Sequence, residues 1–162
     1  MSVERHDWAK LNHLQVGRYA EYLVKMECTL FGLDVYTAEV DNKGIDFVVR
    51  AGVDNFFDVQ VKSVRLKPKT TPYVFMRKSG FEPRSTLLLA LVTMAAGEAA
   101  KIYLIPSLAW IEDDKTIFVS RDYGEGKKSP PEWGLSLSAK ANQKLDTSYR
   151  FEERVQELDG SA

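Results

Sequence analysis

Two short apolar runs joined by a tight turn constrain the fold of this chain more than any other feature. Residues 45–51 (IDFVVRA) and 56–65 (FFDVQVKSVR) are rich in β-branched and aromatic side chains, and the segment GVDN separates them. This composition and spacing predict an antiparallel hairpin. Each run nevertheless carries polar residues where a buried strand would be apolar: Asp46 in the first, Gln60 and Lys62 in the second.

Side chains alternate between the two faces of a strand, so Gln60 and Lys62 are expected to point the same way. On the preceding strand, alternation places Asp46 on the face opposite Phe47. Pairing about the turn then brings Asp46 opposite residues 60–62. The three polar side chains are therefore expected to meet at one end of the hairpin, in a register that a one-residue slip would destroy.

A helical pattern runs from Leu11 to Phe31, and Gly32 follows at the position of a left-handed cap. On a helical wheel Glu21 falls on the apolar side, next to Gly17. If this helix packs across the hairpin, Glu21 reaches the polar cluster, and Gly17 permits a close approach of the helix.

The rest of the chain predicts a central sheet with helices on its faces, which is an α/β fold. We expect a buried strand at 86–94, a surface loop at 122–134, and a C-terminal helix at about 139–158 with Ser138 as its cap. The other predicted elements are strands at 33–38, 72–77, 101–106 and 116–120 and a short helix from Pro106.

Composition sets broad limits on the class of protein. The 162 residues fit a single domain spanning 1–162, with 44% hydrophobic and 28% charged residues. No apolar run is long enough to cross a bilayer, so no membrane association is expected. A charged N-terminal segment and the single Cys28 favour a cytoplasmic location. The net charge of −1 argues against a protein that coats nucleic acid indiscriminately.

The polar residues of the hairpin have the chemistry of a metal site. The Asp46 carboxylate, the Gln60 amide oxygen and the Val61 carbonyl are hard oxygen donors suited to Mg²⁺ or Mn²⁺, and Glu21 is a further ligand, directly or through water. The Lys62 ammonium suits a different task, which is to orient a water and neutralise charge on a phosphodiester transition state.

The order of Glu21, Asp46 in GIDFVV, and Gln60 and Lys62 in DVQVKS resembles the PD-(D/E)XK nuclease superfamily, including its Mrr-type members and small bacterial domains with the same arrangement. The resemblance covers core motifs within 14–65. It implies a restriction-endonuclease-like three-layer core, with a central mixed β-sheet flanked by helices.

The same resemblance assigns a role to each residue. Asp46 is the central metal ligand, Lys62 the catalytic lysine, Glu21 the helical acid, and Gln60 occupies the position that usually holds an acid. Two departures stand out: Gly44 replaces the proline that names the motif, and Gln60 removes one negative charge from the metal site.

We therefore expect Mg²⁺-dependent, endonuclease-like hydrolysis of nucleic-acid phosphodiester bonds, with DNA as the expected substrate, RNA left open, and a homodimer a further possibility. The alternative is a non-catalytic nucleic-acid-binding or complex-assembly domain that retains the nuclease fold. A third reading is a partner-binding protein in which Glu21, Asp46, Gln60 and Lys62 never share a pocket. In that reading Glu21 pairs with Lys25 and Asp46 bonds to loop amides.

Beyond the hairpin, the segment KSVRLKPK contributes Arg65, Lys67 and Lys69. These basic side chains form a predicted phosphate-binding rim beside the site, because cations near DNA phosphates release counterions and strengthen association. A solvated loop without a partner is the competing interpretation.

Overall fold

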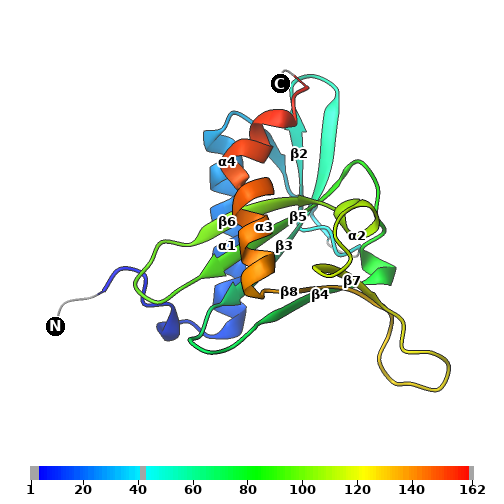
Figure 1. Ribbon diagram of the computed structural model, residues 1–162. Helices are drawn as coiled ribbons and strands as arrows, with labels where there is room; N and C mark the ends of the chain where they lie inside the picture. The colour runs from blue at the N-terminus through cyan, green and yellow to red at the C-terminus, as the bar shows by residue number, and fades with distance from the viewer. Residues whose placement is uncertain (1–3, 41–42, 161–162) are drawn as a thin grey trace.

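The protein folds around a mixed five-stranded sheet, as seen in a computed structural model that describes residues 4–40 and 43–160 (Figure 1). β3 and β5 run parallel, and the other neighbouring strands are antiparallel. In the order β1-β2-β3-β5-β6, the strands are β1 (Asp34–Tyr36), β2 (Phe47–Ala51), β3 (Asn55–Arg65), β5 (Leu87–Met94) and β6 (Lys101–Pro106).

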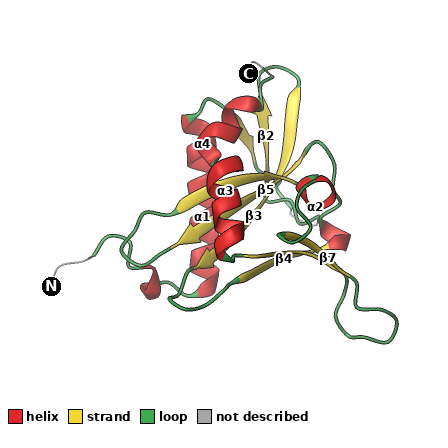
Figure 2. Ribbon diagram, in the orientation of Figure 1, coloured by secondary structure: helices red, strands yellow, loops and turns green. Residues whose placement is uncertain are grey.

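A second, three-stranded sheet of order β4-β8-β7 packs against one face of the main sheet (Figure 2). Its strands are β4 (Tyr73–Arg77), β7 (Phe118–Arg121) and β8 (Glu132–Ser136). The helices are α1 (His13–Leu30), α2 (Ala109–Glu112), α3 (Ala139–Ser148) and α4 (Phe151–Arg154), with short 3-10 helices at Trp8–Lys10, Lys78–Gly80 and Val155–Glu157.

The helices and the second sheet complete three layers. Alternate residues of β5 enter two different cores, Leu88 and Ala90 on one face and Leu87 and Leu89 on the other. The first core lies under α1 and α4, and the second lies under α2, α3 and the second sheet. The expected α/β class, with a central mixed sheet flanked by helices, is confirmed. None of the helices in the described ranges is long and apolar enough to span a bilayer.

Helix α1 lies within the predicted range 11–31, and starts two residues later and ends one residue earlier than predicted. Asn12 caps its first turn by accepting the Gln15 amide at 3.0 Å, while the Gln15 side chain accepts the Asn12 amide at 2.9 Å. At the other end Gly32 has φ +84°, and the Leu33 amide donates to the Cys28 carbonyl at 3.0 Å.

The β2–β3 hairpin has the predicted pairing, with Phe47 opposite Val59 and Ala51 opposite Asn55. The ladder changes at the residue before β2. There the Asp46 amide also donates to the Val59 carbonyl, at 3.0 Å, so two residues of one strand face one residue of the other. This two-against-one arrangement is that of a β-bulge, which interrupts the alternation of side chains.

The predicted alternation across residues 45–47 is therefore wrong. Ile45 packs into the core beside the second sheet, whereas Phe47 packs under α1. Asp46 lines a pocket together with residues of α1, on the same side of the sheet as Phe47.

Two expectations about the C-terminal half also require correction. The helix predicted over 139–158 begins at Ala139 but ends at Ser148, because Arg150 forms a β-bridge with Tyr103 and the Tyr149 carbonyl accepts the Leu104 amide at 2.9 Å. The loop predicted over 122–134 ends early, because β8 begins at Glu132 and pairs with both β4 and β7.

The packing on β8 yields a stability prediction. A Cβ added at Gly134 would lie 1.9 Å from the Tyr73 hydroxyl and 2.5 Å from its ring. Gly134→Ala must displace this ring and is expected to lower the free energy of unfolding by about 1–3 kcal/mol, measured by urea denaturation. The control Gly17→Ala lies in α1 and meets nothing within 4 Å, so it is expected to gain up to about 1 kcal/mol from helix propensity. Equal unfolding midpoints for the two variants would contradict this account.

Candidate active site

The candidate site lies where β2 parts from β3. The Asp58 and Leu66 amides donate toward β5, to the carbonyls of Thr86 and Met94, both at 2.8 Å. The amide and carbonyl groups of the alternate residues of β3, among them Val61, therefore point toward the opposite edge. Beyond the bulge β2 supplies no backbone partner there, and the Asp46 carboxylate accepts the Val61 amide at 2.6 Å.

This bond fixes a carboxylate beside a strand carbonyl. The Val61 carbonyl shares the edge of its own amide, because both groups of a strand residue point the same way. Asp46 and Val61, two of the predicted metal ligands, are thus adjacent at the edge of the sheet. The alternative expected Asp46 to accept loop amides. In this bond Asp46 does accept a backbone amide, but the amide belongs to the strand β3.

Glu21 reaches the same place from α1. Glu21, Asp46 and Val61 line one pocket of about 240 Å³. The Glu21 side chain is only 15% exposed, and its carboxylate forms ion pairs with Arg18 and Lys25, each at 2.8 Å. The structure therefore contains both the Glu21–Lys25 pair and the shared pocket. Gly17 was expected to permit a close approach of the helix, but no close approach occurs there, since a Cβ added at Gly17 would meet nothing within 4 Å.

Gln60 lies on the other face of β3. Its Oε1 is buried and has no hydrogen-bond partner among the described residues. Its Nε2 lies 4.0 Å from the position of a Cβ at Gly44, which would also sit 3.5 Å from the Gly80 carbonyl oxygen. Gly44 has φ +72°, a conformation closed to proline, whose φ is fixed near about −65°. The departure from proline at this position therefore follows from the backbone.

Lys62 shares the strand face of Gln60 and is half-buried. Within the described ranges it makes no hydrogen bond or ion pair. Neither Gln60 nor Lys62 lines the pocket of Glu21 and Asp46, so the structure brings together two of the four predicted catalytic side chains in that pocket. The roles of Gln60 and Lys62 remain predictions.

The oxygen donors at this edge suit a hard cation. Glu21 and Asp46 offer carboxylates and Val61 a carbonyl, whereas the buried Gln60 amide oxygen, which has no partner among the described residues, lies on the other face of β3. Across residues 4–40 and 43–160, no three His, Cys, Asp or Glu side chains cluster closely enough to hold a metal. A cation in the pocket of Glu21 and Asp46 would therefore depend on the Val61 carbonyl as well as on the two acids.

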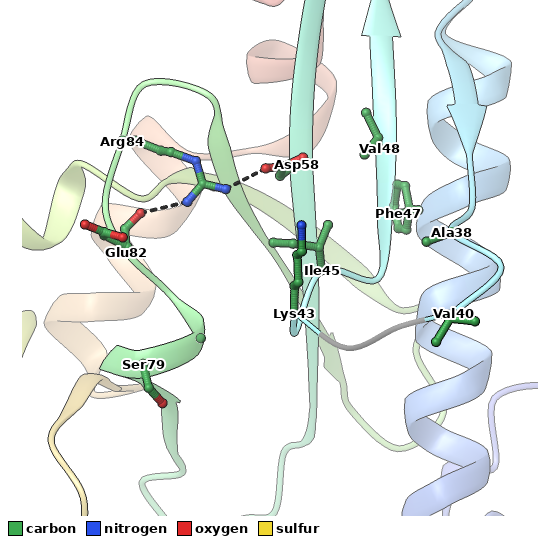
Figure 3. Close-up of a pocket in the computed structure, with 11 residues that line it drawn as sticks. Ala38, Val40, Lys43, Ile45, Phe47, Val48, Asp58, Ser79, Glu82 and Arg84 are labelled. Carbon is green, nitrogen blue, oxygen red and sulfur yellow. Dashed lines mark hydrogen bonds and ion pairs between the residues drawn. The ribbon is translucent and has the colours of Figure 1, made fainter.

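A larger pocket of about 540 Å³, which was not predicted from the sequence, opens on the Gln60 side of the hairpin (Figure 3). Arg84 spans its wall, donating to the Asp58 carboxylate at 2.5 Å and to the Glu82 carbonyl at 3.1 Å. The one available signal was alternation, which places Asp58 on the strand face of Gln60. The lining residues are Ala38, Val40, Lys43, Ile45, Phe47, Val48, Asp58, Ser79, Gly80, Glu82 and Arg84.

The predicted phosphate-binding rim separates into two kinds of residue. Arg65 donates to the carbonyls of Trp8, at 3.2 Å, and Leu11, at 2.7 Å, and so fastens the segment before α1 to β3. Lys67 and Lys69 are exposed in the turn that leads to β4. The lysines are thus open to a ligand, whereas Arg65 has a structural task.

Comparisons with known proteins support the fold. No protein-family model matches this chain, and no curated protein matches it. Among solved structures, 11 chains match. One of them is a bacterial homing endonuclease, I-Ssp6803I, with a TM-score of 0.54 and 19% identity over 92% of this chain and 95% of that chain. At this identity the likeness shows a shared fold, and membership of the PD-(D/E)XK superfamily stays a prediction.

The bond between Asp46 and Val61 makes a prediction about variants. Asp46→Ala leaves the Val61 amide without its acceptor and is expected to lower the free energy of unfolding by about 1–3 kcal/mol. Asp46→Asn keeps an acceptor oxygen and should cost less. Urea denaturation measures both losses, and hydrogen exchange at the Val61 amide should be fastest in Asp46→Ala. Equal exchange in both variants would show that this carboxylate does not hold the strand edge.

Proposed function

We propose that this protein hydrolyses phosphodiester bonds in DNA with the help of a divalent cation. The observation that carries the proposal is the meeting of Glu21 and Asp46 with Val61 in one pocket at the β2–β3 edge. The fold shared with a protein described as a bacterial homing endonuclease supports DNA as the substrate.

The cation would be Mg²⁺, with Mn²⁺ as the alternative. Asp46 and the Val61 carbonyl would hold it, with Glu21 binding directly or through water, whereas the Gln60 amide oxygen lies on the other face of β3 and would have to turn around the strand edge to reach it. When bound, the cation supplies Lewis acidity that stabilises negative charge on the phosphodiester. One carboxylate fewer than in an all-acid site implies modest metal affinity without DNA.

The protein's own groups have separate tasks in this scheme. Lys25 packs its ammonium 5.5 Å from the centre of the Phe47 ring and holds the Glu21 carboxylate in a fixed direction. Arg18 lines the pocket and offers positive charge to an approaching phosphate. Lys62, on the opposite face of β3, would neutralise charge that develops on the phosphate oxygens.

A second candidate function is a non-catalytic DNA-binding or complex-assembly domain. One observation favours it: each acid of the pocket already has a partner within the protein. Asp46 accepts the Val61 amide, and Glu21 is paired with Arg18 and Lys25. A cation would have to share or displace these partners.

Cleavage assays separate the two functions. Supercoiled plasmid and single-stranded DNA would be incubated with Mg²⁺ or Mn²⁺ and with wild type, Asp46→Asn or Lys62→Ala. We expect at least about a 100-fold loss of cleavage in both variants, because each removes charge that acts on the transition state. The control Asp54→Asn changes a carboxylate in the hairpin turn and should cleave like wild type.

The outcomes are distinct. Cleavage by both variants at the wild-type rate would contradict the assigned site. A wild type that binds DNA in a salt-dependent way but cleaves neither substrate would favour the non-catalytic domain.

The basic turn before β4 gives a separate prediction. Lys67→Gln and Lys69→Gln are each expected to reduce the slope of log Kd against log salt concentration for duplex DNA by about 0.9, the value for one lost phosphate contact. Titrations at several salt concentrations measure this slope. Arg65→Gln should instead lower the urea midpoint, because it breaks the bonds to the Trp8 and Leu11 carbonyls. An unchanged slope in both lysine variants would remove the turn from the DNA-binding surface.

A further inference from the structure

The second sheet has one face in the core and one face in solvent. Val74, Met76 and Leu135 point inward and are buried. The register places the outward residues in rows across the strands, since directly paired residues share a face. The rows are Arg77, Glu132 and Arg121; then Phe75, Gly134 and Val119; then Tyr73 and Ser136.

Planar groups are stacked on this outer face. The Tyr73 ring crosses β8 above Gly134, and its hydroxyl donates to Glu132 at 2.8 Å. The Arg121 guanidinium lies 4.5 Å from the centre of the Tyr73 ring. The Phe75 ring lies 6.2 Å from that centre and is inclined by only 19° to the Tyr73 ring. Phe75 therefore forms the last ring of a short stack.

The stack ends at the solvent. Phe75 is 43% exposed, although it occupies the middle row of the sheet. Such a ring face can accept one further planar group, because a nucleobase stacks on an aromatic side chain whatever its sequence.

Charge on the same face favours an anionic partner. Arg77 and Arg121 are exposed. The acid between them, Glu132, is buried and accepts hydrogen bonds from Tyr73 and Tyr123. Burial and the bond to Glu132 raise the pKa of Tyr73 to about 12, so Tyr73 remains a donor at neutral pH.

The loop after β7 adds charges of both signs. Lys127 and Lys128 are exposed, as is Glu125. The acid nearest to β7, Asp122, is paired with Lys78 at 3.0 Å. Four exposed cations, Arg77, Arg121, Lys127 and Lys128, lie on the outer face or in the loop after β7. Among the described residues, the exposed acid of this loop that has no cationic partner is Glu125.

We propose that the outer face of the second sheet binds a single-stranded segment of DNA, with an unpaired base stacked on Phe75 and neighbouring phosphates on Arg77 and Arg121. A duplex does not fit this role, because its bases are already stacked on one another. The inference rests on the proposed function and deepens it by naming a strand-binding surface. β4 leads directly into Lys78–Gly80, and the Gly80 carbonyl lies beside Gly44 near the candidate site.

The test measures binding in EDTA, so that cleavage plays no part. Fluorescence anisotropy would compare an oligothymidylate with an abasic deoxyribose-phosphate oligomer of equal length. Phe75→Ala and Phe75→Leu are each expected to weaken binding of the oligothymidylate by about 10-fold and to leave the abasic oligomer unchanged, since only the former offers bases to stack. The leucine variant keeps an apolar side chain and guards against a folding defect.

A matched control lies elsewhere in the chain. Phe56 is 47% exposed and belongs to the β2–β3 hairpin, at the opposite end of the molecule from the second sheet (Figure 1). Phe56→Ala should bind both oligomers like wild type. Arg77→Gln should weaken both oligomers alike, because it removes a phosphate contact.

Two results would overturn the inference: Phe75 variants that bind oligothymidylate like wild type, or an equal loss for the abasic oligomer or for duplex DNA. These results do not affect the plasmid cleavage assay, so the proposed hydrolysis is tested independently of the strand-binding surface. A wild type that cleaves nothing but binds oligothymidylate through Phe75 would keep the surface and remove the nuclease.

Discussion

The arrangement of the candidate site depends on the β-bulge at Asp46. By placing Asp46 and Phe47 opposite the single residue Val59, the bulge turns the Asp46 side chain toward α1 and Ile45 toward the other core. An unpaired strand amide at Val61 would be costly, and the Asp46 carboxylate removes that cost. The bond that stabilises the strand edge also sets an anionic oxygen beside a carbonyl, so a structural and a metal-binding role for Asp46 are compatible.

Helix α1 is coupled to this edge through a chain of contacts. Glu21 pairs with Lys25, and the Lys25 ammonium lies against the ring of Phe47, the first residue of β2. Exposed ion pairs contribute little to stability, but the Glu21–Lys25 pair is mostly buried. The bond to Lys25 therefore fixes the direction of the Glu21 carboxylate. The orientation of Glu21 thus depends on Phe47, the second of the two bulge residues. Helix and hairpin present their acids to the pocket as one unit.

Local patterns predicted the first third of the fold well, because caps, periodicity and turn length act over a few residues. They specify α1 and the hairpin register. They do not specify long-range pairing. β8 pairs with two strands distant in sequence, and Arg150 leaves the helix for β6. The sequence predicted that Glu21 and Asp46 share a pocket. It did not predict the bulge that separates Asp46 from the face of Gln60, because no residue pattern marks a bulge at this position.

Gly44 replaces the proline of the family motif and lies in contact with the segment that follows β4. Its φ of +72° excludes proline, and it brings the chain close to the Gly80 carbonyl and the Gln60 amide. Gly80 ends the short helix that follows β4, so the backbone before Asp46 touches the segment that leaves the second sheet. A proline at position 44 would require a different path for residues 43–46 and would break this contact. The glycine therefore allows the backbone before Asp46 to lie close to the segment that leaves the second sheet.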